Sequence, residues 1–86
     1  MRLVSIGFGS YISPERIIAA VDPESNPIKR VVTQSKESGK LIDATYGRKT
    51  KTVLIMDSGH VILSPLEPEE FSRRVAESGG AANGEG

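Results

Sequence analysis

The sequence contains no cysteine, only one histidine, and no apolar run as long as a membrane helix. Without cysteine the chain can form neither a disulfide nor a thiolate metal site, and one histidine alone does not make a zinc site. A bilayer-spanning helix needs about 20 consecutive apolar residues. Residues 1–7 also lack the sustained apolar segment and cleavage site of a signal peptide. We therefore expect a soluble, cytoplasmic protein with no metal or other cofactor.

The length of 86 residues leaves room for one small domain. A domain of this size buries only about 60–65% of the surface of its unfolded chain, so its own stability is marginal. With no disulfides, support has to come from helix packing or self-association. The last residues are rich in glycine and poor in apolar side chains. They predict a flexible tail over residues 78–86, after a single domain over residues 1–77.

Charge is balanced overall but unevenly placed, with 11 basic and 11 acidic side chains. Residues 28–52 hold two acidic groups and seven basic ones, a net of +5, and the remainder carries −5. The seven are Lys29, Arg30, Lys36, Lys40, Arg48, Lys49 and Lys51. A neutral molecule with segregated charge can present one cationic face to a polyanion. The alternative is a solvated surface whose charges cluster without a function.

Two apolar runs, residues 52–56 and 61–63, are separated by a short polar turn, which predicts a β-hairpin. Arg48, Lys49 and Lys51 directly precede its first strand. Arginine offers a planar fork to phosphate oxygens or guanine edges, and lysine offers a more tolerant point charge. We interpret this basic loop as a nucleic-acid contact.

Two segments are predicted to be helical. Ser25 or Asn26 can cap a helix with Pro27 in its first turn, and Gly39 can end it. Its buried stripe is predicted at i, i+3, i+4 and i+7, on Ile28, Val31, Val32 and Ser35. A second helix is predicted after Pro68, where glutamates suit the positive end of the helix dipole. Its apolar contacts are expected from Phe71 and Val75, with Arg73 and Arg74 exposed.

Short strands are predicted for the remaining apolar segments. Residues 16–21 favour a strand, although Ser13-Pro14-Glu15 would also begin a helix. Gly7-Phe8-Gly9-Ser10 is interpreted as a backbone bend, because it completes neither glycine-rich phosphate-binding fingerprint. The continuous run 53–56 indicates apolar groups on both faces of a sheet. Either self-association or irregular burial by loops would cover the second face.

Enzymatic chemistry has little support in the sequence. A Walker phosphate loop is excluded, because its first glycine is missing and an arginine interrupts its Gly-Lys pair. His60 with Asp57, and with Ser58 or Ser64 as nucleophile, is the hydrolase arrangement to consider. Nothing in the spacing of Asp43 and Asp57 forces a carboxylate pair. We expect a non-enzymatic protein.

Several phrases resemble the RemA family of bacterial extracellular-matrix regulators over about residues 3–75. They are GFGSYISPERIIAAV, PIKRVV, KLIDATYGRKTKTVLIMDSGHVILS and PEEFSRRV, in that order. The resemblance implies an α+β fold, a small mostly antiparallel sheet with two short helices, similar to LytTR-type DNA-binding domains. It also implies a closed heptameric or octameric ring that binds double-stranded DNA in the nucleoid. The implied targets are clustered sites upstream of biofilm matrix and osmoprotection operons.

The resemblance also assigns roles to individual residues. Arg48 matches a family arginine that contacts DNA, and Lys49 stands where a second arginine is usual, so the charge is kept and the planar fork is lost. Arg16 matches an arginine needed for activity, as a DNA contact or at the subunit boundary. Pro27 matches a proline whose replacement disturbs function, and it is assigned a structural role or a role in oligomerisation. Apart from the resemblance, Arg30 is a further candidate for support, near the same face as the basic loop or at the subunit boundary.

Two other binding functions stay open at this point. The same basic loop could bind RNA, with Tyr46 stacking on an unpaired base. A ring could also serve a structural role by binding an acidic protein.

Overall fold

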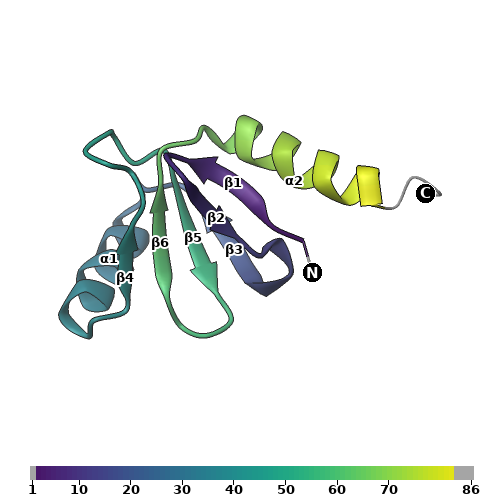
Figure 1. Ribbon diagram of the computed structural model, residues 1–86. Coiled ribbons are helices and arrows are strands. Elements are labelled where there is room, and N and C mark those ends of the chain that lie inside the picture. Colours follow the sequence, from purple (N-terminus) through teal and green to yellow (C-terminus); the bar gives the residue numbers. More distant parts are fainter. Residues whose placement is uncertain (1, 83–86) are drawn as a thin grey trace.

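The structure is a computed structural model that describes residues 2–82. Figure 1 shows how its strands and helices are arranged in space. In chain order the elements are β1 (Val4–Gly7), β2 (Ser10–Ile12), the 3-10 helix η1 (Pro14–Arg16), β3 (Ile17–Val21), α1 (Asn26–Glu37), β4 (Leu41–Asp43), β5 (Thr52–Met56), β6 (Val61–Ser64) and α2 (Pro68–Ala82).

The described strands form two sheets instead of the single predicted one. β1 and β2 make an antiparallel hairpin, and the other four strands form a sheet in the order β3-β5-β6-β4. Within this larger sheet only the pairing of β4 with β6 is parallel. The predicted β5–β6 hairpin is confirmed and forms the centre of the sheet. The α+β class, the mostly antiparallel pairing and the two helices are confirmed as well.

The hydrophobic core lies between the larger sheet, the β1–β2 hairpin and α2 (Figure 1). Leu54 of β5 has none of its surface exposed and belongs to this core. The other buried members of the cluster are Val4, Ile6, Ile12, Ala44, Met56, Ile62 and Phe71. Burial of a large apolar side chain contributes about 1.5–3 kcal/mol. These contacts hold the β1–β2 turn close to the connections at the same end of the larger sheet.

The apolar run of β5 is buried on both faces of the sheet, as its continuous pattern indicated. Val53 and Leu54 are neighbours and therefore point to opposite faces. Both are fully buried within a single chain. The run therefore does not need a second copy of the chain to cover it. Ile18 and Ile42 remain exposed on the edge strands β3 and β4.

Helix α1 begins where its capping residues predicted. The Ser25 hydroxyl accepts a hydrogen bond from the Ile28 N–H at 3.2 Å. Pro27 follows in the first turn, where a missing N–H removes no bond within the helix. Gly39, with a φ of 78°, lies just beyond the last turn, in the left-handed conformation expected after a helix. Of the predicted stripe only Ser35 is buried, and the three apolar residues are half-buried.

Helix α2 corrects the expectation that Arg74 is exposed. Its guanidinium donates to the Ser5 carbonyl at 3.0 Å and to the Glu70 carboxylate at 2.6 Å. The side chain is half-buried, because its long stem lies across β1 and brings the charge to a backbone acceptor at the strand edge. Arg74 therefore fastens α2 to the N-terminal hairpin.

The C-terminal helix extends into the predicted tail. Helix α2 continues to Ala82, so residues 78–82 are helical, and the flexibility expected of residues 78–86 stays a prediction. The Ser78 hydroxyl accepts a hydrogen bond from Arg2 at 3.1 Å and donates one to the Val75 carbonyl at 2.9 Å, which ties this turn to the domain. Residues 83–86, the rest of the predicted tail, lie outside the described residues.

None of the helices between residues 2 and 82 is long and apolar enough to cross a bilayer. The likeness to LytTR-type domains and the closure into a ring stay predictions.

Candidate nucleic-acid interface

The basic residues lie in the connection between β4 and β5, residues 44–51, which crosses over the end of β6. At its start the Ala44 N–H donates to the Leu63 carbonyl at 3.0 Å. At its end the Lys51 N–H donates to the Ser64 carbonyl at 2.9 Å. Both ends are therefore fixed to the same strand. The loop cannot shift far without breaking a backbone hydrogen bond, so its cations stay at one place on the sheet.

A tight turn shapes the first half of this loop. The Asp43 carboxylate accepts hydrogen bonds from the Thr45 hydroxyl at 2.5 Å and from the Thr45 N–H at 2.9 Å. Both bonds lower the pKa of the Asp43 carboxyl, and the bond from the Thr45 hydroxyl has the larger effect. The Arg48 N–H then donates to the Thr45 carbonyl at 3.0 Å. Tyr46 in this turn has a φ of 53°, a left-handed conformation that costs a residue with a side chain roughly 1–2 kcal/mol.

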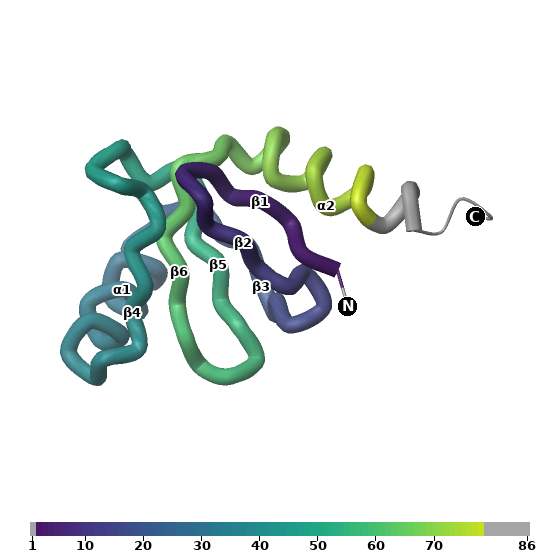
Figure 2. The backbone as a smooth tube through the Cα atoms, in the orientation of Figure 1, coloured from purple at the N-terminus to yellow at the C-terminus, as the bar shows by residue number. Residues whose placement is uncertain are grey.

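The turn between β1 and β2 meets this loop, and Figure 2 shows the two backbone segments at the same end of the sheet. Three side chains from them form a surface that we call the aromatic–cationic platform: Phe8, Tyr46 and Arg48. The Phe8 and Tyr46 rings are stacked, with centroids 5.3 Å apart and planes 28° apart. The Arg48 guanidinium lies over the Phe8 ring, 5.5 Å from its centroid, within the range of a cation–π contact.

The platform belongs to the surface of the molecule and not to its core. Phe8 is 47% exposed and Tyr46 is 68% exposed. Arg48 is exposed as well. An aromatic ring beneath the guanidinium limits the directions in which it can point, so Arg48 is held outward next to two accessible rings.

A cavity of about 550 Å³ adjoins the platform, and we call it the cationic groove. Its lining residues are Gly7, Phe8, Arg48, Lys49, Lys51, Pro65 and Leu66. Three of these carry a positive charge, and none of the described residues lining the groove is acidic. The remaining lining is apolar or backbone. The groove therefore combines cations with an apolar surface, which suits a ligand that has both anionic and planar apolar parts.

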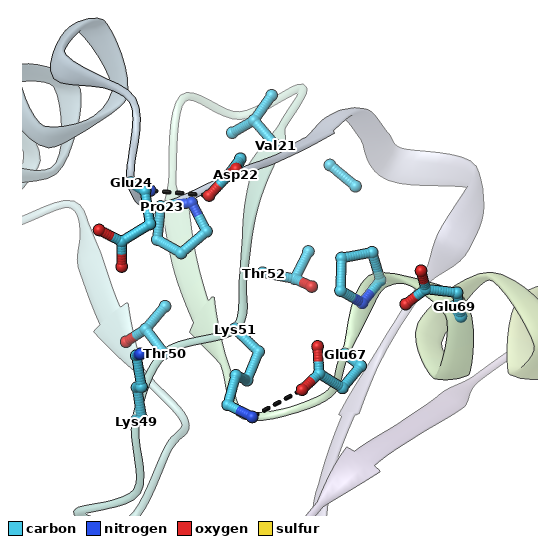
Figure 3. A pocket seen from close by; sticks show the side chains of 12 residues that line it. Val21, Asp22, Pro23, Glu24, Lys49, Thr50, Lys51, Thr52, Glu67 and Glu69 are labelled. Carbon is cyan, nitrogen blue, oxygen red and sulfur yellow. Dashed lines mark hydrogen bonds and ion pairs between the residues drawn. The ribbon is translucent and has the colours of Figure 1, made fainter.

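A second cavity, of about 450 Å³, lies beside the same loop and is acidic (Figure 3). Lys49 and Lys51 line it together with four carboxylates, those of Asp22, Glu24, Glu67 and Glu69. The Lys51 ammonium lies 2.7 Å from the Glu67 carboxylate, and Figure 3 shows the side chain turned toward it. Among the described residues Arg48 and Lys49 form no such ion pair. The two unpaired cations are therefore the stronger candidates for phosphate contact.

Arg16 lies apart from the basic loop within one chain. It precedes β3, which runs antiparallel to β5, so it sits beside the end of β5 and the basic loop sits at the start. The separation along β5 is roughly 15 Å. Arg16 Nε is 3.3 Å from the Asp57 carboxylate, and the Arg16 carbonyl accepts a hydrogen bond from the Asp57 N–H at 2.8 Å. Its role at DNA or at a subunit boundary stays a prediction.

Arg30 and Pro27 lie on α1, exposed to solvent. Neither residue lines the cationic groove. The structure therefore brings together the three cations of the basic loop and leaves Arg16 and Arg30 elsewhere. The predicted contribution of Pro27 to assembly stays a prediction.

The hydrolase arrangement considered from the sequence is not assembled. Ser58 Oγ lies 2.7 Å from His60 Nδ1, but Asp57, the acid expected to orient the imidazole, pairs with Arg16 instead. Ser64, the other candidate nucleophile, is fully buried. Asp43 hydrogen-bonds to Thr45 at the opposite end of the sheet from the β5–β6 turn, so no carboxylate pair forms. The described residues contain no cluster of His, Asp and Glu side chains suited to a metal ion.

Sequence reasoning missed Phe8 as a candidate for the interface. Its signal was present, because an aromatic residue between two turn glycines lies at the tip of a bend, where it has no place in the core. The positive φ values of Gly7, Phe8 and Gly9 confirm the bend. Its meeting with Tyr46, far along the chain, could not be read from local patterns.

Comparison with known proteins agrees with the resemblance noted in the sequence. The RemA-like family, described as extracellular matrix regulatory protein A-like, matches residues 3–75. A Cyanothece protein named "Putative regulatory protein" is 57% identical over 74 residues, covering 86% of this chain and 81% of its own length. Relatives from Bacillus cytotoxicus and Bacillus mycoides, named in the same way, are each 55% identical over 75 residues, covering 87% of this chain and 86% of theirs. The chain, matched over almost all of its described length, belongs to the RemA-like family.

Proposed function

We propose that the protein is a transcription regulator that binds double-stranded DNA through the cationic groove and acts without enzymatic activity. The observation that carries the proposal is the composition of the groove: three cations on a loop anchored at both ends, with no carboxylate among its lining residues. Fixed cations on a rigid support are suited to the regularly spaced phosphates of a duplex. The family and the names of its relatives support a regulatory role.

One chain offers too few contacts to bind DNA tightly. Each cation that neutralises a phosphate contributes about −0.9 to the slope of log affinity against log salt, so the three give at most about −2.7, a value that requires Lys51 to leave Glu67. A protein whose binding depends strongly on salt makes about 6–10 phosphate contacts, two to three times as many. Repetition of the groove by symmetry supplies them without any new type of contact. We therefore include in the proposal a closed homo-oligomer, a heptameric or octameric ring in line with the family resemblance.

The proposed setting follows from the same resemblance. The regulated genes are those for biofilm matrix and osmoprotection, and the protein acts in the cytoplasm, associated with the nucleoid. Arg16 and Arg30, which lie away from the groove in one chain, are assigned to the boundary between copies or to additional phosphate contacts.

The test compares two single charge removals. Arg48→Ala removes an unpaired cation from the groove, and it is expected to abolish or severely weaken the shift of promoter DNA. Lys36→Ala removes an exposed cation from the last turn of α1 and serves as the matched control, with binding close to that of the wild type. Light scattering checks that the assembly mass is the same for all three proteins. Unchanged DNA binding by Arg48→Ala would overturn the assignment of the groove.

RNA binding remains the second candidate, because exposed aromatic rings beside cations are typical of surfaces that bind single strands. Competition between duplex DNA and single-stranded RNA of equal length separates the two functions. If the single-stranded RNA displaces the bound duplex DNA preferentially, RNA binding is the favoured function. Indifference to both polyanions would instead favour an acidic protein as the partner.

A further inference from the structure

The stack of Phe8 and Tyr46 leaves an aromatic surface open to a ligand. Tyr46 is 68% exposed although its ring is stacked on Phe8, so most of the side chain is accessible. Phe8 is the more covered of the two, with the Arg48 guanidinium over its ring. Phe8 and Arg48 line the groove, whereas Tyr46 lies outside its lining and keeps the more accessible side chain.

Neither ring is explained by the stability of the fold. Both residues adopt a positive φ, which disfavours any residue with a side chain, and neither belongs to the hydrophobic core. The contact between two exposed aromatic rings stabilises the fold by less than the two left-handed residues, Phe8 and Tyr46, together cost. The arrangement therefore offers the folded chain little net benefit and holds two rings at a fixed place beside the cations.

The neighbouring groups define the chemistry of the ligand. Arg48, Lys49 and Lys51 line the groove next to Phe8, where they would attract phosphates. A flat apolar group stacks well on Tyr46, and a nucleotide carries such a group about one sugar away from its phosphate. In an intact duplex each base is already stacked on its neighbours, so only a base displaced from the stack can reach the ring.

We propose that Tyr46 is a stacking site for a DNA base that has left the duplex stack, with Phe8 as a positioning residue that holds both Tyr46 and Arg48. This inference rests on the proposed function and deepens it. In addition to the phosphate contacts, the protein would then contact a DNA base. The protein would then recognise DNA that is easily unstacked in preference to stiff DNA, without reading hydrogen-bonding groups on the bases.

The first experiment uses the absence of tryptophan from the chain. Tyr46→Trp places a single reporter in the stacking site, and Tyr11→Trp places one at the other tyrosine, which is 61% exposed on β2 and forms no ring stack among the described residues. Addition of duplex DNA with one central unpaired adenine is expected to quench the fluorescence of the first variant strongly. It is expected to leave that of the second nearly unchanged.

The second experiment measures affinity for two duplexes, one fully paired and one with the unpaired adenine. The wild type is expected to prefer the second by roughly 5- to 150-fold, the range that stacking of one base supplies. Tyr46→Leu is expected to lose this preference while keeping the salt dependence, because Tyr46 does not line the groove and the phosphate contacts remain. Phe8→Leu is expected to lose the preference and also to weaken binding of the paired duplex, because Phe8 holds Arg48 as well. Tyr11→Leu is the matched control and keeps both. Light scattering follows the assembly mass of each variant.

The outcomes are distinct. Binding of paired DNA by the wild type with no preference for the unpaired base, or an unquenched tryptophan at position 46, overturns the stacking site and leaves the proposed function standing. Failure of the wild type to bind either duplex overturns both. Loss of assembly mass in Tyr46→Leu or Phe8→Leu would assign the rings to contacts between subunits and also overturn the stacking site.

Discussion

Removal of the negative charge at Glu67 is predicted to strengthen DNA binding. Glu67 holds Lys51 in an ion pair at 2.7 Å, beside the cationic groove that Lys51 also lines. Before Lys51 can neutralise a phosphate it has to leave this carboxylate. Glu67→Gln removes the competing anion and leaves a side chain of nearly the same size.

The magnitude follows from the exposure of the pair. The Lys51 and Glu67 side chains are 37% and 60% exposed, so water screens the interaction and the pair contributes about 0.2–1 kcal/mol. Release of Lys51 therefore raises affinity about 1.4- to 5-fold for each chain that contacts the DNA. The slope of log affinity against log salt becomes steeper by up to about 0.9 for each such chain, because Lys51 then counts as a full phosphate contact.

Fluorescence anisotropy of a labelled promoter duplex, titrated at several salt concentrations, measures both quantities. Glu69→Gln is the matched control, because Glu69 lines the same acidic cavity and undergoes the same change of charge. It forms no ion pair with Lys51 among the described residues, so only the general electrostatic effect is expected from it. If the two variants bind DNA equally, the Lys51–Glu67 pair does not limit binding. If Glu67→Gln binds DNA more weakly than the wild type, Lys51 is not a phosphate contact that Glu67 holds back.

Three further predictions concern stability. Leu54→Ala removes a fully buried side chain and is expected to lower the free energy of unfolding by about 2.7–5 kcal/mol in urea titrations, whereas Leu3→Ala, the same change at an exposed position, is expected to lower it by less than about 0.5 kcal/mol. Ser25→Ala removes the cap of α1 and is expected to cost about 1 kcal/mol in the same assay, and no loss would mean that water replaces the cap fully. Hydrogen bonds from Arg73, and then from Arg74, lower the pKa of Glu70, so its contribution is complete above the unfolded-state pKa of about 4.3 and is lost as the pH falls through the lower folded-state pKa. The urea midpoints of the wild type and Glu70→Gln should therefore differ at pH 6 and converge in strong acid, and a difference that persists there would contradict this account.

Local signals in the sequence predicted the elements that depend on neighbouring residues. The cap at Ser25, the left-handed Gly39 and the β5–β6 hairpin each result from chemistry within a few residues, and each is present. The pattern of charge likewise predicted the basic loop, because the loop is continuous in sequence. These features needed no knowledge of how distant segments pair.

The features that the sequence did not predict depend on contacts between distant segments. The parallel pairing of β4 with β6 and the separate β1–β2 sheet are not specified by any local pattern. The Arg74 side chain was expected to be exposed, because no residue near it in the sequence indicates that it donates a hydrogen bond to the Ser5 carbonyl. The platform joins Phe8 to a loop almost forty residues later, and only the shared core of the two sheets brings them together.

The strand order β3-β5-β6-β4 also has a consequence for the newborn chain. β3 and β4 leave the ribosome first, yet their hydrogen-bond partners are β5 and β6, which are made later. Until synthesis has reached β5 (Thr52–Met56), the small β1–β2 hairpin is the only pairing among the described strands that the chain can form. The larger sheet is therefore complete only after the β5–β6 hairpin has been synthesised. Its edge strands, β3 and β4, stay unpaired until their partner strands have been made.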